Sequence, residues 1–206
     1  MKRCALIGST KIAEIHAREL INNGINDLTV VSRNIKKSKK FSEKLSLKFN
    51  KKIKFLNHQN FKKKNFDIIS ICSNTKYHLD NLKIIKNKNA KIIVEKPLFQ
   101  LKNFNDTNKV LNRIYKKYPN IFVSYPMIYL TNFFIKNFKV NENINSIYVY
   151  YQTRGNKLGL EIFFDLAPHV ITVIIGLLKK KKLTINSVSS KINKKSVTIN
   201  FKILNK

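Results

Sequence analysis

Lys96 is the residue of this sequence that is best placed to do chemistry. It stands between Glu95 and Pro97, directly after the apolar run of residues 90–94. Because Pro97 fixes its own backbone and biases the preceding residue towards an extended conformation, the lysine is expected at the end of a strand. Ligands of open α/β sheets bind at strand ends, where a lysine can hold a substrate oxygen and stabilise developing negative charge. The alternative is a surface lysine in front of a turn proline.

Three ionisable residues follow one another at intervals of four around a long apolar run: Glu161, Asp165 and His169. This spacing places them on one face of a helix. Buried ionisable groups are costly unless they are paired, which favours a polar pocket or a mutual network. His169 is the candidate general acid and base, because its pKa lies near working pH, and Asp165 would orient its ring. The alternative makes Asp165 a helix N-cap, with Pro168 in the first turn.

A turn that suits a dinucleotide follows the first expected strand, residues 3–7. Gly8 would make the tight turn, and the start of the next helix would offer N–H groups and a positive dipole end to a pyrophosphate. Thr10 stands where the dinucleotide fingerprint has its middle glycine, so its β-carbon is expected where bare backbone would approach the pyrophosphate. The alternative is a plain α/β turn. The residues expected to contact a cofactor here are Gly8, Ser9, Thr10, Lys11 and Ile12.

Ser32 and Arg33 follow the second expected strand, at about the place where an acidic residue would hold the ribose hydroxyls of NAD. A hydroxyl and a guanidinium suit the 2′-phosphate of NADP instead. The cofactor is therefore expected to be NADP, with NAD as the second choice. The alternative is an exposed loop arginine.

The elements that must position these residues alternate between strand and helix over the first 124 residues. Apolar runs predict strands at residues 3–7, 28–31, 53–56, 66–71, 90–94 and 121–124, with helices between them. Right-handed crossovers then give a doubly wound parallel sheet, so residues 1–124 are expected to form a Rossmann domain. Residues 125–206 are expected to form a shortened α+β domain with an antiparallel sheet, because residues 147–151 and 196–202 alternate in polarity around a helix at 161–178.

Composition limits the class of protein. The chain has 206 residues, 41 of them basic and 11 acidic, for a net charge of +30. Only five of the basic residues are Arg, and the lysines are scattered rather than grouped with aromatic residues, so no nucleic-acid partner is expected. Cys4 and Cys72 lie in expected buried strands without metal-ligand spacing, which indicates reduced core residues, no metal site and a cytoplasmic protein. No signal peptide or membrane span is expected.

Taken in order along the chain, these motifs resemble the Gfo/Idh/MocA family of NAD(P)-dependent sugar oxidoreductases, which includes glucose-fructose oxidoreductase and inositol dehydrogenase. Residues 7–13 with His16 resemble the opening glycine motif of the family, departing from it at Thr10. Residues 71–78 resemble the turn after the fourth strand, although Asn74 and Thr75 replace the usual Thr-Pro-type pair. Residues 95–97 match the signature tripeptide, and residues 165–169 resemble the aspartate and histidine helix of the second domain.

The resemblance implies an oxidoreductase that transfers a hydride between nicotinamide and a sugar or polyol carbon, with the lysine and the histidine on either side of the reacting carbon. It adds Ser73, Asn74, His78 and Glu95 to the cofactor site, together with Lys96, and gives Tyr125 and Glu161 to the substrate site. An interior histidine is the alternative for His16 and for His78. The alternative function is a nucleotide-binding or scaffolding relative without activity. Apolar strand faces in the second domain predict a homo-oligomer, with residues 148–151 near the contact.

Overall fold

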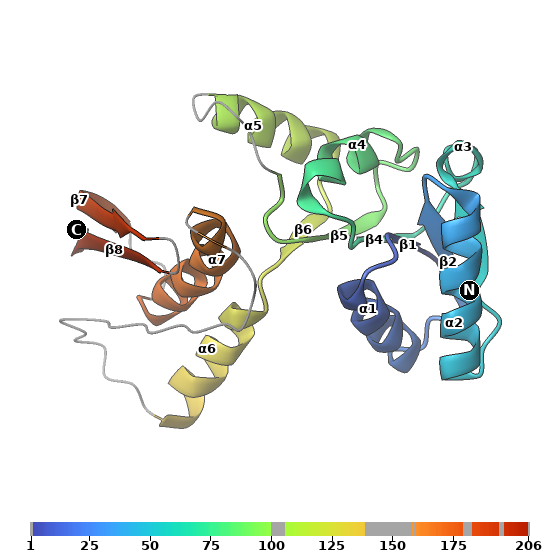
Figure 1. Cartoon of the computed structure of the whole chain (residues 1–206), viewed down its shortest axis with the longest axis horizontal. Helices are drawn as coiled ribbons and strands as arrows, with labels where there is room; N and C mark the ends of the chain where they lie inside the picture. The colour runs from blue at the N-terminus through green and yellow to red at the C-terminus, as the bar shows by residue number, and fades with distance from the viewer. Residues whose placement is uncertain are drawn as a thin grey trace. The chain divides into compact units, whose positions relative to one another are not determined.

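The computed structural model describes residues 2–99, 106–138, 158, 160–178, 183–193 and 196–205. The chain divides into two compact units, Met1–Ser124 and Tyr125–Lys206 (Figure 1). The strand that the sequence predicts at residues 147–151 lies outside the described residues.

The first unit is built on a six-stranded parallel sheet with the strand order β3-β2-β1-β4-β5-β6. The predicted doubly wound Rossmann fold is therefore confirmed. Along the chain its elements are β1 (Arg3–Ile7), α1 (Lys11–Asn22), β2 (Asp27–Ser32), α2 (Ile35–Phe49), β3 (Lys54–Asn57), α3 (His58–Phe61), β4 (Ile68–Ile71), the 3₁₀ turn η1 (Thr75–Tyr77), α4 (His78–Lys83), β5 (Lys91–Glu95), α5 (Thr107–Lys117) and β6 (Ile121–Ser124).

Two apolar cores hold the sheet between its helices. On one side, α1 and α2 cover the sheet, and the buried residues include Leu6, Ala13 and Leu45. On the other side, α4 and α5 cover it, with Ile71 and Tyr118 among the buried residues (Figure 1). The central strands β1, β2 and β4 are thus buried on both faces, which is why they read as continuous apolar runs. Parallel strands bring their carboxyl ends to the same edge of the sheet, where the turns to the following helices lie.

The second unit contains two helices and a strand pair. Helix α6 (Pro126–Phe138) packs on α7 (Leu160–Leu177), and β7 (Leu183–Ile192) pairs antiparallel with β8 (Val197–Asn205). Gly176 of α7 meets Thr131 of α6 so closely that a β-carbon on the glycine would lie 2.8 Å from the threonine Cγ2. The shortened α+β domain predicted for residues 125–206 stays a prediction. Among the described residues, no helix is long and apolar enough to cross a membrane.

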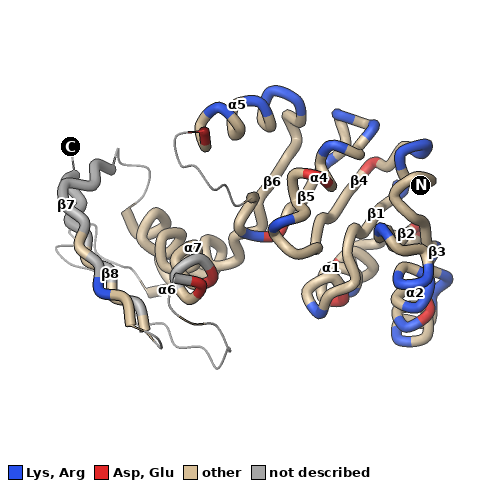
Figure 2. Tube along the Cα trace, turned by 45° about the horizontal axis from the view of Figure 1, so that its top comes forward, with Lys and Arg blue, Asp and Glu red and all other residues tan. Residues whose placement is uncertain are grey.

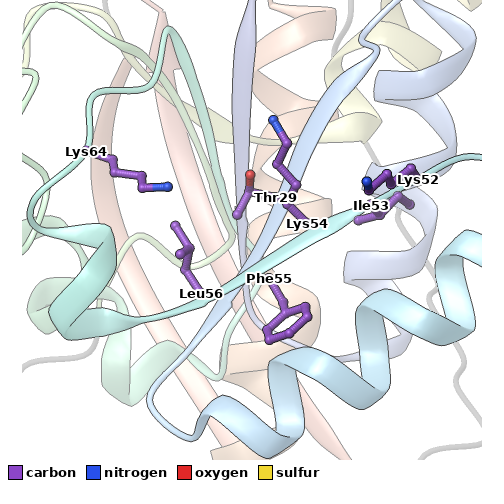
Figure 3. Close-up of a pocket in the computed structure, with 7 residues that line it drawn as sticks. All are labelled: Thr29, Lys52, Ile53, Lys54, Phe55, Leu56 and Lys64. Carbon is purple, nitrogen blue, oxygen red and sulfur yellow. The ribbon is translucent and has the colours of Figure 1, made fainter.

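Basic residues are spread over the first unit rather than gathered on one face. Lysines and arginines recur along α2, along α5 and in the turn after α3 (Figure 2). At the edge strand β3, they border a shallow hollow lined by Thr29, Lys52, Ile53, Lys54, Phe55, Leu56 and Lys64 (Figure 3). An unpaired strand edge is a template for pairing with another chain, and charged side chains such as lysine oppose this. We therefore assign the hollow to edge protection, since its lining centres on the strand itself rather than on the turns at the carboxyl ends.

Candidate functional site

The turn from β1 to α1 has no room for a side chain at its first position. Gly8 has a φ of +126°, and a β-carbon there would lie 2.8 Å from the carbonyl carbon of Cys72 and 2.9 Å from the amide nitrogen of Ser73. Both neighbours are backbone atoms of the segment that follows β4, so neither can give way cheaply. The glycine is needed because the two strand ends pass so close to one another.

Thr10 stabilises the same turn. Its hydroxyl donates to the carbonyl oxygen of Cys72 at 2.8 Å and accepts from the amide of Ala13 at 3.3 Å, so Thr10 is the N-cap of α1. The side chain thus engages the end of β4 and the first turn of its own helix. The obstruction of a pyrophosphate that the sequence predicts at this position stays a prediction. Within the described part of the chain, the amides of Lys11 and Ile12 donate to no other group, and these are the N–H groups that an anionic ligand would meet.

A buried ion pair connects α1 to the strand that carries the signature tripeptide. His16 Nε2 lies 2.9 Å from Glu95 Oε1, and both side chains are only 15% exposed. His16 Nδ1 lies 2.8 Å from Ser70 Oγ, which in turn lies 3.3 Å from Cys72 Sγ. A charged imidazole can donate from both ring nitrogens, so this arrangement suits an imidazolium that donates to the carboxylate and to the serine.

Each member of this pair favours the charge of the other. Burial acts to lower the pKa of His16, but the influence of Cys72 and Glu95 outweighs it and raises this pKa to about 10. Burial acts to raise the pKa of Glu95, but His16 outweighs it, with smaller contributions from Ser124 and Lys96, and the pKa falls below its usual value. Glu95 is therefore a carboxylate at the end of β5 that is stabilised mainly by its ion pair with His16.

His78 holds the tripeptide segment from the opposite side of the sheet. It has no exposed surface, and its Nε2 lies 2.8 Å from the carbonyl oxygen of Ser73. Its Nδ1 lies 3.1 Å from the carbonyl oxygen of Pro97 and 3.2 Å from that of Leu98. The ring thus joins the turn after β4 to the segment after β5. The interior-histidine alternative fits this environment, because a fully buried ring has no surface to offer a cofactor.

Ser73 is anchored by a second polar contact, because Asn81 Nδ2 donates to Ser73 Oγ at 2.7 Å. Asn74 accepts from the amide of Lys76 at 3.3 Å and so caps η1. Their predicted contacts with the cofactor stay predictions.

The end of β2 is basic and lacks a carboxylate. Ser32 Oγ donates to the carbonyl oxygen of Asn34 at 2.5 Å, and the exposed Arg33 stacks on Tyr77 with its guanidinium carbon 3.8 Å from the ring centre. His58, at the end of β3, has a lowered pKa because it is partly buried and because Arg33 and Lys62 are positive. The anion-favouring charge here therefore comes from Arg33 and Lys62, whereas the lowered pKa favours the neutral form of His58.

The residues expected to do chemistry fall in both units. Lys96 is half-buried directly after β5, and the half-buried Tyr125 directly follows β6. In the second unit, Asp165 and His169 are half-buried and lie one turn apart inside α7, with the exposed Glu161 one turn earlier. The helix begins at Leu160, so the alternative that made Asp165 its N-cap is wrong.

A family model described as an oxidoreductase family with an NAD-binding Rossmann fold matches residues 2–127. The chain belongs to the Gfo/Idh/MocA family. No protein of curated function matches it in sequence. The Rossmann fold of the first unit is thus that of an oxidoreductase family described as NAD-binding.

Solved structures of the family share the fold of the chain at low identity. A dehydrogenase from Clostridium difficile is 17% identical with a TM-score of 0.67, and the match covers 100% of this chain and 67% of that one. Myo-inositol dehydrogenase from Lactobacillus casei, solved with NAD(H) and myo-inositol, is 15% identical with a TM-score of 0.63, covering 98% and 64%. An assigned myo-inositol dehydrogenase from Sinorhizobium meliloti is 16% identical with a TM-score of 0.62, and the match covers 92% of this chain and 59% of that one. The chain thus spans about three fifths to two thirds of the length of these relatives.

Three features of this Gfo/Idh/MocA member were not predicted from the sequence: the ion pair of His16 with Glu95, the capping by Thr10 and the stacking of Tyr77 under Arg33. Ser70 was a usable signal for the first, because it is a polar residue in an otherwise apolar buried strand. The stacking of Arg33 on Tyr77 has no such signal in the sequence, because both residues lie in polar segments between the strands.

Proposed function

We propose that the chain is an NADP-preferring oxidoreductase that transfers a hydride between nicotinamide and a sugar or polyol carbon. The observation that carries this proposal is the combination, in one family member, of a dinucleotide turn at Gly8 with Lys96 at the end of β5. A small-molecule polyol is the substrate class of the proposal because the Lactobacillus casei relative was solved with myo-inositol.

The residues of the turn suit the phosphates of a dinucleotide. The unused amides of Lys11 and Ile12 at the start of a 12-residue helix favour a negative group. Arg33, stacked on Tyr77 after β2, favours a further phosphate at that strand end. This supports NADP over NAD, since a guanidinium suits a 2′-phosphate and no carboxylate is present to hold free ribose hydroxyls.

The bound nicotinamide would supply the hydride acceptor or donor at its C4 atom. When a CH–OH group is oxidised, the carbon gives up a hydride and the hydroxyl gives up a proton, and the reverse reaction returns both. His169 is proposed to take or return that proton, with Asp165 orienting its ring from one turn earlier. Lys96 is proposed to hold the substrate oxygen and stabilise its developing negative charge, and Tyr125 and Glu161 to contact the substrate.

The test measures cofactor binding and turnover separately. Calorimetric titration should show tighter binding of NADPH than of NADH, and Arg33→Ala should remove most of that difference. Steady-state rates with inositols and hexoses should then identify a substrate, and Lys96→Ala and His169→Ala should each lower kcat by about 100-fold or more with cofactor binding retained. Equal cofactor affinities would refute the 2′-phosphate site. Full activity of His169→Ala would refute its role in proton transfer.

The second candidate is a non-catalytic nucleotide-binding relative. It is favoured by Thr10, which occupies the place of the middle glycine of the fingerprint. Tight NADPH binding without turnover on any polyol, sugar or related carbonyl compound would support it. A homo-oligomer and a cytoplasmic location complete the proposal, and light scattering tests the first of these.

A further inference from the structure

One stacked pair of side chains bridges the carboxyl end of β1. Arg33 follows β2, Tyr77 ends η1 after β4, and the sheet order places β1 between these two strands. The guanidinium carbon of Arg33 nevertheless lies 3.8 Å from the centre of the Tyr77 ring. The pair therefore spans the place where a nucleotide bound at the strand ends would lie.

The ring of Tyr77 is fixed in position by the turn that carries it and can stack with a planar ligand. Asn74 caps η1 by accepting from the Lys76 amide, which fixes the short turn that carries the ring. Lys76 Nζ lies 5.0 Å from the ring centre, and the two cations Arg33 and Lys76 lower the pKa of the tyrosine. An aromatic ring that is already fixed and surrounded by cations loses little freedom when an anionic nucleotide stacks on it.

We propose that the ring of Tyr77 carries the adenine base of NADP(H), and that Arg33 moves off the ring when the base binds. The inference rests on the proposed function, which it deepens at the adenine end of the cofactor. A separation of 3.8 Å is a single layer of van der Waals contact, so no purine fits between the two side chains as they stand. The base takes the place of the guanidinium on the ring.

This exchange makes Tyr77 a specificity-determining residue. Binding of any adenine nucleotide breaks the contact between Arg33 and Tyr77. A 2′-phosphate compensates for that loss, because the displaced guanidinium can pair with it beside Ser32 and the partly buried His58. A nucleotide without the 2′-phosphate offers no such compensation. The stacked pair thus lowers the affinity for NAD relative to NADP, independently of any contact with the ribose.

The test uses adenosine 2′,5′-bisphosphate and 5′-AMP as probes of the adenine end, titrated calorimetrically into the full chain at fixed salt. Tyr77→Ala should weaken both ligands by roughly 5- to 100-fold, the range expected for loss of one base–aromatic stack. Tyr77→Phe keeps the ring and should bind as the wild type does. Tyr115→Ala removes a tyrosine that is 48% exposed on α5 and should leave both affinities unchanged.

Arg33→Ala separates the two parts of the exchange. The variant should bind 5′-AMP more tightly than the wild type, because the ring is uncovered, and should bind the bisphosphate more weakly, because the partner of the 2′-phosphate is gone. Loss of affinity for both ligands in Arg33→Ala would overturn the proposed exchange. Circular dichroism verifies that each variant is folded.

Three results would overturn the role of Tyr77: wild-type affinity in Tyr77→Ala, equal losses in Tyr77→Phe and Tyr77→Ala, or no binding of either probe to the wild type. The proposed function is judged independently, by NADPH turnover. If the enzyme turns over NADPH and the Tyr77 variants bind both probes normally, the role of Tyr77 is refuted and the proposed function stands. If binding of the probes depends on Tyr77 but no substrate is turned over, the enzymatic function is refuted and the role of Tyr77 stands.

Discussion

Replacing Glu95 by Gln removes one charge from the buried pair with His16 and keeps the size of the side chain. The pair raises the pKa of His16 from 6.5 to about 10. A shift of this size corresponds to about 4 kcal/mol of folding free energy at pH 7. Since Cys72 and Glu95 both contribute to it, we assign about half to Glu95 and expect Glu95→Gln to destabilise the protein by about 2 kcal/mol.

The expected loss depends on pH in a defined direction. Because the folded pKa of His16 is raised, its contribution is fully present below pH 6.5 and is lost as the pH rises towards about 10. The pKa of Glu95 is lowered, so its contribution is present above its usual value of 4.5 and is lost as the pH falls. The difference between wild type and Glu95→Gln should thus be largest near pH 5.5–6.5 and should approach zero near pH 10.

Urea unfolding followed by far-UV circular dichroism at four pH values between 5.5 and 10 measures this difference. Deprotonation of the many lysines at high pH acts on both proteins alike and cancels in the comparison. Glu19→Gln is the matched control, because it breaks an ion pair with Arg18 whose side chains are 54% and 55% exposed, and it should cost less than about 1 kcal/mol at every pH. A Glu95→Gln difference that does not vary with pH would refute the reasoning.

Three further substitutions test close packing by thermal unfolding. Gly8→Ala should destabilise by about 3 kcal/mol or more, because its β-carbon would overlap the backbone at Cys72 and its φ is unfavourable for alanine; a loss below 1 kcal/mol would contradict this. His78→Ala should cost about 3 kcal/mol, because buried carbonyl oxygens lose their partner, and wild-type stability would refute the role of the ring as a clamp. Gly176→Ala should cost about 1–3 kcal/mol, and Thr131→Ala in the same chain should restore most of it; additive losses would contradict the contact.

The parallel sheet could be predicted because its central strands are buried on both faces. The run at residues 66–71 and the stop at Gly8 are local signals, and the structure has a strand and a turn at these places. The helix predicted at residues 161–178 is present as α7, which spans Leu160–Leu177. Only the alternative that placed Pro168 in a first turn is wrong; it followed from local propensity, because proline lacks an N–H and disfavours a helix interior. The remainder of the helix tolerates this one proline.

The pairing of side chains could not be predicted, because periodicity tells only which face of an element a residue occupies. His16 and Glu95 are 79 positions apart, and their contact follows from the sheet order that places β4 between β1 and β5. The role of Thr10 depends likewise on the carbonyl oxygen of Cys72, a backbone atom that no residue type reveals. The sequence therefore allows candidate residues to be named, and these stay predictions, but it does not reveal their partners in the fold.

The scattered lysines have a kinetic consequence for any anionic ligand. The chain has a net charge of +30, and in the first unit its basic residues are spread over α2, α5 and the β3 edge, so they produce a positive potential around that unit rather than a single steering patch (Figure 2). Such a field speeds the arrival of anions at low ionic strength, and the more highly charged nucleotide benefits more. At low salt, NADP would therefore arrive faster than NAD even if Arg33 were absent. Salt screens this advantage in arrival rate, whereas the dissociation rate is set by short-range contacts at the ends of β2 and β4.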